Sequence, residues 1–430
     1  MSPTTALIVL VVTFVALVLL RFPIALVLIG SSLVVAWGMN IPLAVIGQQL
    51  IQGLNSYTLL AIPFFILAGQ IMSEGGLALR LVNMAQLFVG AVRGGLAMVN
   101  CIACLMFGNI SGSAAADAAS VGSVMIPMMK KKRYDADFTT ALTSAAAVQG
   151  VVMPPSHNMI LYAVAAGGVS ISSLFMAGVI PAFLMLFALM IAAYIVSSVR
   201  KYEKGEPVPL KEAPRIIRDG FLSLMTGVII LGGIFTGWFT ATESGAIACV
   251  YAFILTFFVY KDLPLRHFAV ILVKTFRTVS MVFFLIAASK AFGWVLTYLK
   301  IPMLVSDLFM SISDNPYIIM LLINILLLIL GSPMDMAPLI LIMTPILFPV
   351  VTSLGMDPVH FGIIMILNLG IGLITPPVGT VLFVGCAIGK VSVEAATKAL
   401  VPFYIALIAV LMIITYVPGL VMFLPNLMKG

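Results

Sequence analysis

Charged side chains are scarce in this chain of 430 residues, because Asp, Glu, Lys and Arg together make up only 9% of it. An ordinary soluble domain has about 25% charged residues. Apolar residues make up 62% of the chain instead, and the mean hydropathy is +1.22. This composition excludes a soluble enzyme, a disordered tail protein and a disulfide-rich secreted module.

Cysteine is also rare, and motifs of soluble chemistry are absent. The four cysteines (Cys101, Cys104, Cys249 and Cys386) lie in apolar surroundings, which predicts buried thiols and not disulfides or zinc ligands. There is no His-Glu-x-x-His and no Gly-x-Ser-x-Gly sequence. The segment Gly385–Lys390 is one residue short of a phosphate loop and is followed by Val391, where Ser or Thr is required. We therefore do not expect ATP to drive this protein, and we expect no cofactor.

Long continuous apolar runs dominate the sequence. A membrane-spanning helix needs about 20 apolar residues, so a chain of 430 residues has room for about 10–12 such helices with their loops. The runs do not alternate with the period of two that a membrane strand requires. The sequence therefore predicts an all-α integral membrane protein, surrounded by membrane lipid.

The basic residues indicate how this protein lies in the membrane. The net charge of +7 would suit nucleic-acid binding in a soluble protein, but here Lys and Arg gather in short breaks between apolar runs. Arg21, Lys130–Arg133 and Arg200 mark such breaks, and the positive-inside rule places them on the cytoplasmic side. The N-terminus is then outside, and the first twenty residues, which have no basic n-region, form a retained helix and not a signal peptide.

Four apolar segments are interrupted by Gly, Pro and small polar residues. In the first half, the segment 94–130 is broken at 108–113 and the next span, from about 137 to 166, is broken at 153–158. In the second half, the segment 316–352 is broken at 331–338 and the span from about 359 is broken at 375–380. We expect continuous helices at about 1–20, 24–40, 57–74, 174–199, 221–238, 244–260, 280–298 and 398–416, with interfacial stretches at 42–56 and 262–278.

The interruptions recur in the same order in the two halves of the chain. The two Pro-Pro pairs, at Pro154 and Pro376, lie 376 − 154 = 222 residues apart, and each follows an overlong interrupted segment. Basic residues flank both ends of the first such segment, which places these ends on the cytoplasmic side. The flanks of the second segment contain no Lys or Arg, which places its ends outside. The pattern predicts two inverted repeats, each with a re-entrant hairpin and a broken helix, which is typical of secondary transporters. The alternative is four unrelated kinks, since Gly and Pro are common here.

Broken helices leave backbone carbonyl and N–H groups without partners inside the membrane. Carbonyl ends with nearby hydroxyl and amide oxygens suit Na⁺, and helix N-termini suit a carboxylate. The side chains that can supply these oxygens are Asn109, Ser111, Ser113, Ser156 and Asn158 in the first half and Ser332, Asp335, Thr375 and Thr380 in the second. Alternatively, individual hydroxyls bond back to their own helices.

Charged residues inside a membrane span are functional candidates by default. Asp117 and Asp335 lie at the two interrupted hairpins, where each either caps amides or contacts an ion or substrate. Lys290 lies in the middle of a span and either pairs with substrate carboxylate or plays a structural part. His157 either relays protons or is an ordinary hydrogen-bonded histidine, and a Ser111–His157 intramembrane serine protease is a remote alternative.

Four motifs together resemble one family over essentially the whole chain. They are Gly108-Asn-Ile-Ser-Gly-Ser-Ala-Ala-Ala-Asp117, Met153-Pro-Pro-Ser156, Ser172-Ser-Leu-Phe-Met-Ala-Gly178 and Gly370-Ile-Gly-Leu-Ile-Thr-Pro-Pro-Val-Gly379. They resemble the large membrane subunit of tripartite ATP-independent periplasmic (TRAP) transporters. The resemblance implies an elevator-type fold of the ion-transporter superfamily, in which hairpins and broken helices move against a fixed scaffold.

The resemblance also implies where ions and substrate bind. The first Na⁺ site would be formed by Asn109, Ser111, Gly112, Ser113, Met153, Pro154 and Ser156. The second would be formed by Gly331, Ser332, Met334, Asp335, Thr375, Pro376 and Gly379. We expect the carboxylate substrate to contact Ser111, Ser113, Asp117, Asn158, Lys290 and Thr380.

The sequence thus predicts a non-enzymatic Na⁺-coupled importer subunit of the bacterial inner membrane. Its implied partners are a separate small four-helix membrane subunit and a soluble periplasmic binding protein, and its substrates are C4-dicarboxylates, keto acids or sugar acids. Pro155-Ser-His-Asn158 resembles the sialic-acid branch. We expect scaffold parts at 1–93 and 220–300, transport parts at 94–199 and 301–430, and a cytoplasmic linker at 200–219. A stand-alone Na⁺/dicarboxylate symporter is the alternative.

Overall fold

The computed structural model describes residues 1–90, 92–205, 209 and 211–429, and within them the chain is helical throughout. No strand occurs in these ranges, where the sole β-type pairing is one antiparallel bridge between Arg93 and Lys204. Among the described residues, seven helices are long and apolar enough to cross a membrane, and further apolar helices of 10–17 residues accompany them. The prediction of an all-α membrane fold is confirmed.

The first half contains continuous helices, one hairpin and one broken helix. Its elements are α1 (Pro3–Leu19), α2 (Ile24–Gly38), α3 (Leu43–Leu54), η1 (Tyr57–Leu60), α4 (Ala61–Glu74), α5 (Leu77–Val89), α6 (Gly95–Ser111), α7 (Ala114–Lys131), α8 (Ala136–Ala147), α9 (Gln149–Val152), α10 (His157–Ala165) and α11 (Ile171–Val199). Helices α6 and α7 form the first hairpin, and α8, α9 and α10 form the first broken helix.

The second half repeats this order. Its elements are α12 (Ala213–Phe235), α13 (Ala241–Ile254), η2 (Leu255–Val259), η3 (Leu265–His267), α14 (Phe268–Tyr298), α15 (Ile301–Ile312), α16 (Pro316–Gly331), α17 (Met336–Ser353), α18 (Pro358–Gly372), α19 (Thr380–Gly389), α20 (Val393–Tyr416) and α21 (Pro418–Lys429). Helices α16 and α17 form the second hairpin, and α18 and α19 form the second broken helix.

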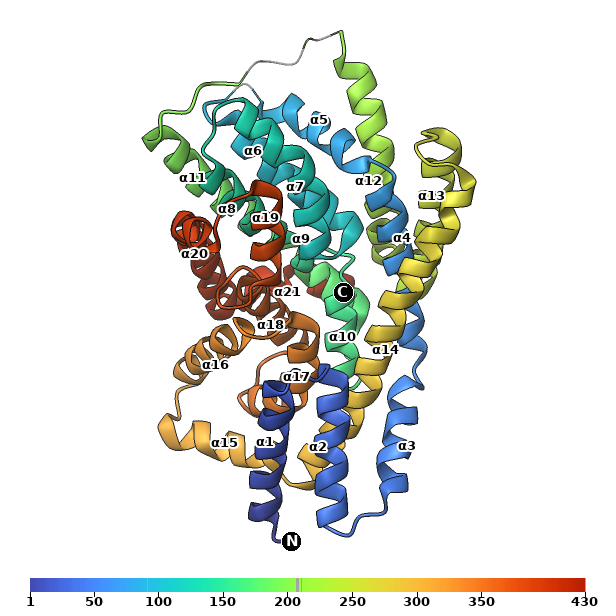
Figure 1. Ribbon diagram of the computed structural model, residues 1–430, viewed down its shortest axis with the longest axis vertical. Helices are drawn as coiled ribbons and strands as arrows, with labels where there is room; N and C mark the ends of the chain where they lie inside the picture. Colours follow the sequence, from blue (N-terminus) through green and yellow to red (C-terminus); the bar gives the residue numbers. More distant parts are fainter. Residues whose placement is uncertain (91, 206–208, 210, 430) are drawn as a thin grey trace.

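The two halves interlock through their hairpins and broken helices. The second arm of each hairpin packs against the last part of the other half's broken helix, because α7 contacts α19 and α17 contacts α10. The first arm of each hairpin packs against the broken helix of its own half, α6 against α8 and α9, and α16 against α18. Figure 1 shows the long helix α14 running beside α2, α3 and α4, and α14 also contacts α17.

Several helix boundaries differ from those expected. The interfacial stretch 262–278 and the span 280–298 were expected to be separate, but α14 begins at Phe268, within the first of them, and continues to Tyr298 without a break. Its counterpart in the first half is divided between α3 and α4, at Asn55 and Ser56. Helix α12 begins at Ala213, so the last residues of the expected linker are helical.

Three helices were missed by the sequence analysis, namely α5, α15 and α21. Helices α5 and α15 follow the third span of each half and are too short to cross a membrane, so no long apolar run marks them. Helix α21 follows Val417 and begins at Pro418, which suits the first position of a helix. The helix expected to be last, α20, is therefore followed by another.

Buried amide side chains tie each hairpin to its broken helix. Asn100 Nδ2 of α6 donates to Thr143 Oγ1 of α8 at 2.6 Å. In the second half, Asn368 Nδ2 of α18 donates to Asn324 Oδ1 of α16 at 2.9 Å, and Asn324 Nδ2 donates to Thr415 Oγ1 of α20 at 3.1 Å. All five side chains are buried. Because unsatisfied polar groups are costly in an apolar interior, these bonds favour one relative position of hairpin and broken helix.

Candidate functional site

The tip of the first hairpin is a two-residue turn pressed against the first broken helix. Helix α6 ends at Ser111, and Gly112 adopts a left-handed conformation with φ of +61°. Ser113 is the N-cap of α7, and its side chain accepts a hydrogen bond from the Ala116 amide. A Cβ atom added to Gly112 would lie 2.6 Å from the Pro155 carbonyl oxygen and 3.2 Å from Ser156 Cα. Tip and break are thus in direct backbone contact.

Asp117 lies fully buried behind this tip. Its Oδ1 atom accepts a hydrogen bond from Ser111 Oγ, and Ser111 Oγ in turn accepts one from the Ser113 amide at 3.1 Å. Its Oδ2 atom has no hydrogen-bond partner among the described residues. Glycines make the space for it, since a Cβ atom on Gly150 would lie 2.0 Å from Oδ2 and one on Gly108 would lie 3.0 Å from it. The carboxylate therefore orients Ser111 and does not cap the helix amides.

More oxygen atoms without partners surround the same tip. Asn109 is buried and lies against α12, where a Cβ atom on Gly227 would be 1.9 Å from its Nδ2. Within the described part of the chain, Asn109 Oδ1 and Ser156 Oγ have no hydrogen-bond partner. Buried polar atoms without partners are rare in folded proteins, so this cluster could receive a ligand.

The first break is fixed from behind by α11. Met153, Pro154, Ser156 and Asn158 are buried. A Cβ atom on Gly178 of α11 would lie 2.4 Å from the Val152 carbonyl oxygen, so only glycine allows α11 to approach so closely. The His157 ring interacts with the backbone of Gly112, which connects the start of α10 to the tip.

The second tip meets the second broken helix in the same way. The Val378 amide donates to the Ser332 carbonyl at 3.2 Å. A Cβ atom on Gly372 would lie 2.6 Å from the Gly331 carbonyl oxygen, so the two helix ends touch through their backbones. Gly379 has φ of +37°, and a Cβ atom there would lie 3.0 Å from the Thr375 carbonyl oxygen. Carbonyl groups therefore converge at this break.

Side chains at the second tip are more exposed than those at the first tip, and two of them form hydrogen bonds to carbonyl groups of their own helices. Ser332 Oγ donates to the Ile329 carbonyl at 3.0 Å, and Thr375 Oγ1 donates to the Ile371 carbonyl at 2.8 Å. For these two hydroxyls, the alternative of bonding back to their own helix is confirmed. Asp335 precedes α17 and makes no side-chain capping bond, and Thr380 is the first residue of α19.

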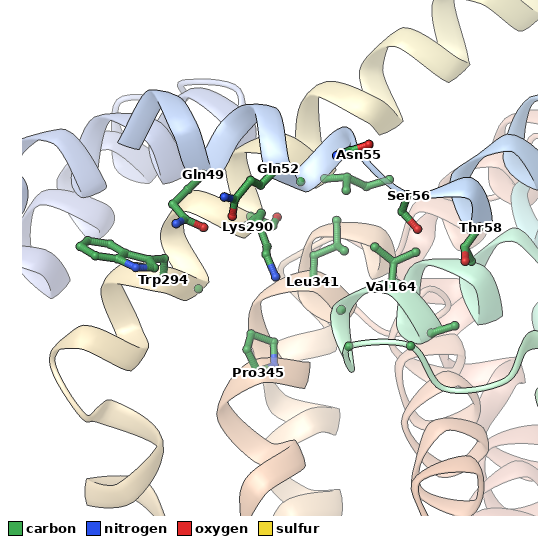
Figure 2. Close-up of a pocket in the computed structure, with 18 of the residues that line it drawn as sticks. Gln49, Gln52, Asn55, Ser56, Thr58, Val164, Lys290, Trp294, Leu341 and Pro345 are labelled. Carbon is green, nitrogen blue, oxygen red and sulfur yellow. The ribbon is translucent and has the colours of Figure 1, made fainter. Parts of the chain in front are cut away.

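A separate cavity of about 470 Å³ lies between α3 and α14 on one side and α10 and α17 on the other. Figure 2 shows the Lys290 side chain extending from α14 into this space, with Gln52 above it and Pro345 of α17 below. The residues that line it are Gln49, Gln52, Gly53, Asn55, Ser56, Thr58, Ala163, Val164, Ala165, Gly167, Gly168, Ile286, Ser289, Lys290, Gly293, Trp294, Thr297, Leu341 and Pro345.

The structure therefore divides the residues expected to contact substrate. Only Lys290 of that set lines the cavity, whereas Ser111, Ser113 and Asp117 lie at the first tip, Asn158 follows the first break and Thr380 follows the second. Sequence reasoning missed the polar residues of α3 and its following turn, because it treated that stretch as interfacial. It also missed the buried amides Asn100, Asn324 and Asn368, although a lone Asn within a long apolar run was a usable signal.

A wider cavity of about 920 Å³ lies near the start of α12 and is lined by acidic and basic side chains. Both basic residues that line it have acidic partners. Arg80 forms a two-pronged ion pair with Asp262 at 2.7 and 2.8 Å, and Arg215 lies 3.9 Å from Asp219. The basic groups of this cavity are thus compensated by carboxylates, whereas Lys290 has no carboxylate within 4 Å among the described residues.

Comparison with known proteins identifies relatives over most of the chain. Residues 11–420 match the family described as "Tripartite ATP-independent periplasmic transporter, DctM component". The C4-dicarboxylate TRAP transporter large permease protein DctM of Pseudomonas aeruginosa is 41% identical over 88% of each chain. The sialic acid TRAP transporter large permease protein SiaM of Vibrio cholerae is 39% identical over 89% of this chain and 90% of that protein.

A solved structure shares the fold. The YdaH transporter of Alcanivorax borkumensis superposes with a TM-score of 0.62, covering 87% of this chain and 88% of that one. At 12% sequence identity, this similarity concerns the architecture alone.

Proposed function

Because the chain belongs to the DctM family of tripartite ATP-independent periplasmic transporters, we propose that it is a Na⁺-driven importer subunit for organic carboxylates in a bacterial inner membrane. It is a transporter permease and not an enzyme, which excludes the serine-protease alternative. In agreement, Ser111 Oγ donates its hydrogen bond to Asp117 and not to His157, which would be the base of such a protease. The names of the two relatives, for C4-dicarboxylates and sialic acid, support the substrate class.

The observation that carries the Na⁺ assignment is the cluster of unpartnered oxygens at the first tip. Asn109 Oδ1, Ser156 Oγ and Asp117 Oδ2 are buried without hydrogen-bond partners among the described residues. A small hard cation prefers oxygen ligands and would compensate the buried carboxylate. At the second tip the ligands would be mainly carbonyl groups, together with Asp335.

The contacts between elements support an elevator mechanism. We infer that 94–199 and 301–430 move as the transport part against scaffold parts at 1–93 and 220–300, with 200–219 as a cytoplasmic linker. The interlocking of α7 with α19 and of α17 with α10 would hold the transport part together during the movement. The basic breaks would keep the N-terminus on the periplasmic side.

Reconstituted uptake tests this function. Proteoliposomes would contain this chain with its small four-helix membrane partner, and radiolabelled sialic acid and succinate would be offered with an inward Na⁺ gradient. We expect uptake only when both Na⁺ and the cognate periplasmic binding protein are present. Uptake with Na⁺ alone would instead support the stand-alone symporter, and uptake that is independent of Na⁺ would contradict both.

Ser111→Ala is expected to raise the Na⁺ concentration for half-maximal uptake by about tenfold, since one oxygen ligand of a charged group contributes about 1.4 kcal/mol or more. The measurement is initial uptake rate against Na⁺ concentration. Ser123→Ala is a matched control, because its hydroxyl only donates to the Ser120 carbonyl of its own helix and is exposed. An unchanged Na⁺ dependence in Ser111→Ala would remove this residue from the cation site.

A further inference from the structure

The cavity between α3, α14, α10 and α17 is a second polar site apart from the two tips. None of the tip residues lines it. Its volume of about 470 Å³ falls within the range of about 300–1,000 Å³ that small-molecule sites occupy. Its walls come from elements of both the proposed scaffold and the proposed transport part.

Lys290 brings an uncompensated positive charge into this cavity. Among the described residues, no carboxylate lies within 4 Å of its ammonium group. Its stem is held by α3, where a Cβ atom on Gly53 would lie 2.8 Å from Lys290 Cβ. Figure 2 shows the ammonium nitrogen directed into the open space and not along the surface of α14.

Hydrogen-bonding groups surround this charge. Ser289, adjacent to Lys290 on α14, is only 6% exposed, and its Oγ has no hydrogen-bond partner among the described residues. Gln49 and Gln52 of the neighbouring helix α3 present amide groups to the same cavity, and Asn55 lies at the end of that helix. A buried hydroxyl without a partner beside an uncompensated ammonium group is suited to an anion with two or more oxygen atoms.

The position of the cavity along the chain indicates which side of the membrane it faces. Gly167 and Gly168 lie in the connection from α10 to α11, and Thr297 lies near the C-terminal end of α14. The basic groups Lys130–Arg133 and Arg200 lie at the opposite ends of the adjoining helices α7, α8 and α11. By the positive-inside rule, the cavity is on the outer side.

We propose that this cavity is an outer reception site that binds the carboxylate of the incoming substrate through Lys290 before the substrate reaches the tips. The proposal rests on the proposed function and adds a second binding site to it. Because α10 and α17 form one wall of the cavity, movement of the transport part would change the shape and volume of the cavity. Substrate bound there would thus be released towards the tips when those helices move.

A cysteine reporter tests occupancy directly. Gln52→Cys places a thiol on the exposed wall, while the four native cysteines are buried. The complex in phosphatidylcholine nanodiscs, which lack anionic lipid headgroups, would be labelled with uncharged N-ethylmaleimide, with and without N-acetylneuraminate or succinate. We expect the transported anion to slow the labelling by about fivefold or more. Thr297→Cys is a second reporter if Gln52→Cys does not fold.

Lys290→Gln in the reporter background should abolish this protection. Ser311→Cys on α15 is exposed and outside the cavity, so its labelling should not respond to the anion. Protection that persists in the Lys290→Gln variant would overturn the role of Lys290. Labelling of Gln52→Cys that is unaffected by an anion that the wild-type complex transports would overturn the site itself.

Uptake measurements separate this inference from the proposed function. Lys290→Gln is expected to raise the half-saturating substrate concentration about tenfold and leave the Na⁺ dependence unchanged. Lys300→Gln, which removes the same charge nearby but outside the cavity, should have no effect. A wild-type complex that transports no carboxylate would refute the proposed function and this inference with it. A complex that transports one equally well in Lys290→Gln would refute the inference alone.

Discussion

Gly372→Ala is expected to lower Na⁺-driven uptake by about tenfold or more without preventing membrane insertion. The added methyl group would lie 2.6 Å from the carbonyl oxygen, 2.7 Å from the carbonyl carbon and 2.8 Å from the Cα atom of Gly331. All three are backbone atoms, so no rotamer change can relieve the overlap, and the second tip must move away from its broken helix. A displacement of about 1 Å in an assembled site can reduce its activity by about a hundredfold.

Gly232→Ala is the control for this substitution. Gly232 lies within α12, and nothing would lie within 4 Å of its added Cβ atom. The change should preserve uptake and stabilise the helix by up to about 1 kcal/mol. Initial uptake rates and the elution profile of the purified complex would be compared for both variants. Wild-type uptake in Gly372→Ala would show that contact between the second tip and its break is not needed for transport.

Sequence alone was sufficient to locate the four breaks, because their signals are local. Pro154 and Pro376 lack backbone donors and restrict the residues before them, and each break falls within an otherwise continuous apolar run. The prediction therefore needed no knowledge of distant residues. The approach of Gly331 to Gly372, in contrast, is a tertiary contact across about forty residues. Gly331 begins a predicted break and Gly372 lies within a motif, but nothing in the sequence indicates that these two glycines meet.

The cavity was not predictable for a related reason. Lys290 was recognised as an intramembrane charge, but Gln49, Gln52 and Asn55, which line the same cavity, belong to a stretch that resembles an interfacial segment. These residues come together only because α3 packs along α14, which in turn requires Gly53 at the contact. Helix α14 itself was divided in the prediction, since its first part contains Lys274 and Arg277 and reads as a polar boundary. Tertiary packing determined both features.

Asp117→Asn is expected to lower uptake by about 10- to 100-fold while leaving the protein as stable as wild type or more so. The substitution keeps the shape of the side chain but replaces a fully buried carboxyl group, which can carry the negative charge that compensates Na⁺, by an amide, which cannot. Loss of a group that orients a metal ligand commonly weakens metal binding by about that factor. A buried carboxyl group with one oxygen lacking a partner destabilises the ion-free protein, and a neutral amide in its place is less costly to bury than a carboxylate.

If Asp117→Asn lowers uptake without lowering the stability of the protein, then Asp117 serves ion binding and not the fold. Thermal unfolding of the purified complex would be measured with Na⁺ and with an impermeant organic cation in its place. Na⁺ should raise the unfolding temperature of the wild type, because a ligand of the folded state stabilises it, and should have a smaller effect on Asp117→Asn. Asp307→Asn, at an exposed position on α15, should behave as wild type in both measurements.

If Asp117 only supported the fold by holding Ser111, then Asp117→Asn would lower the unfolding temperature and keep the full response to Na⁺. The response to Na⁺ therefore decides whether the buried carboxylate serves the ion or the fold.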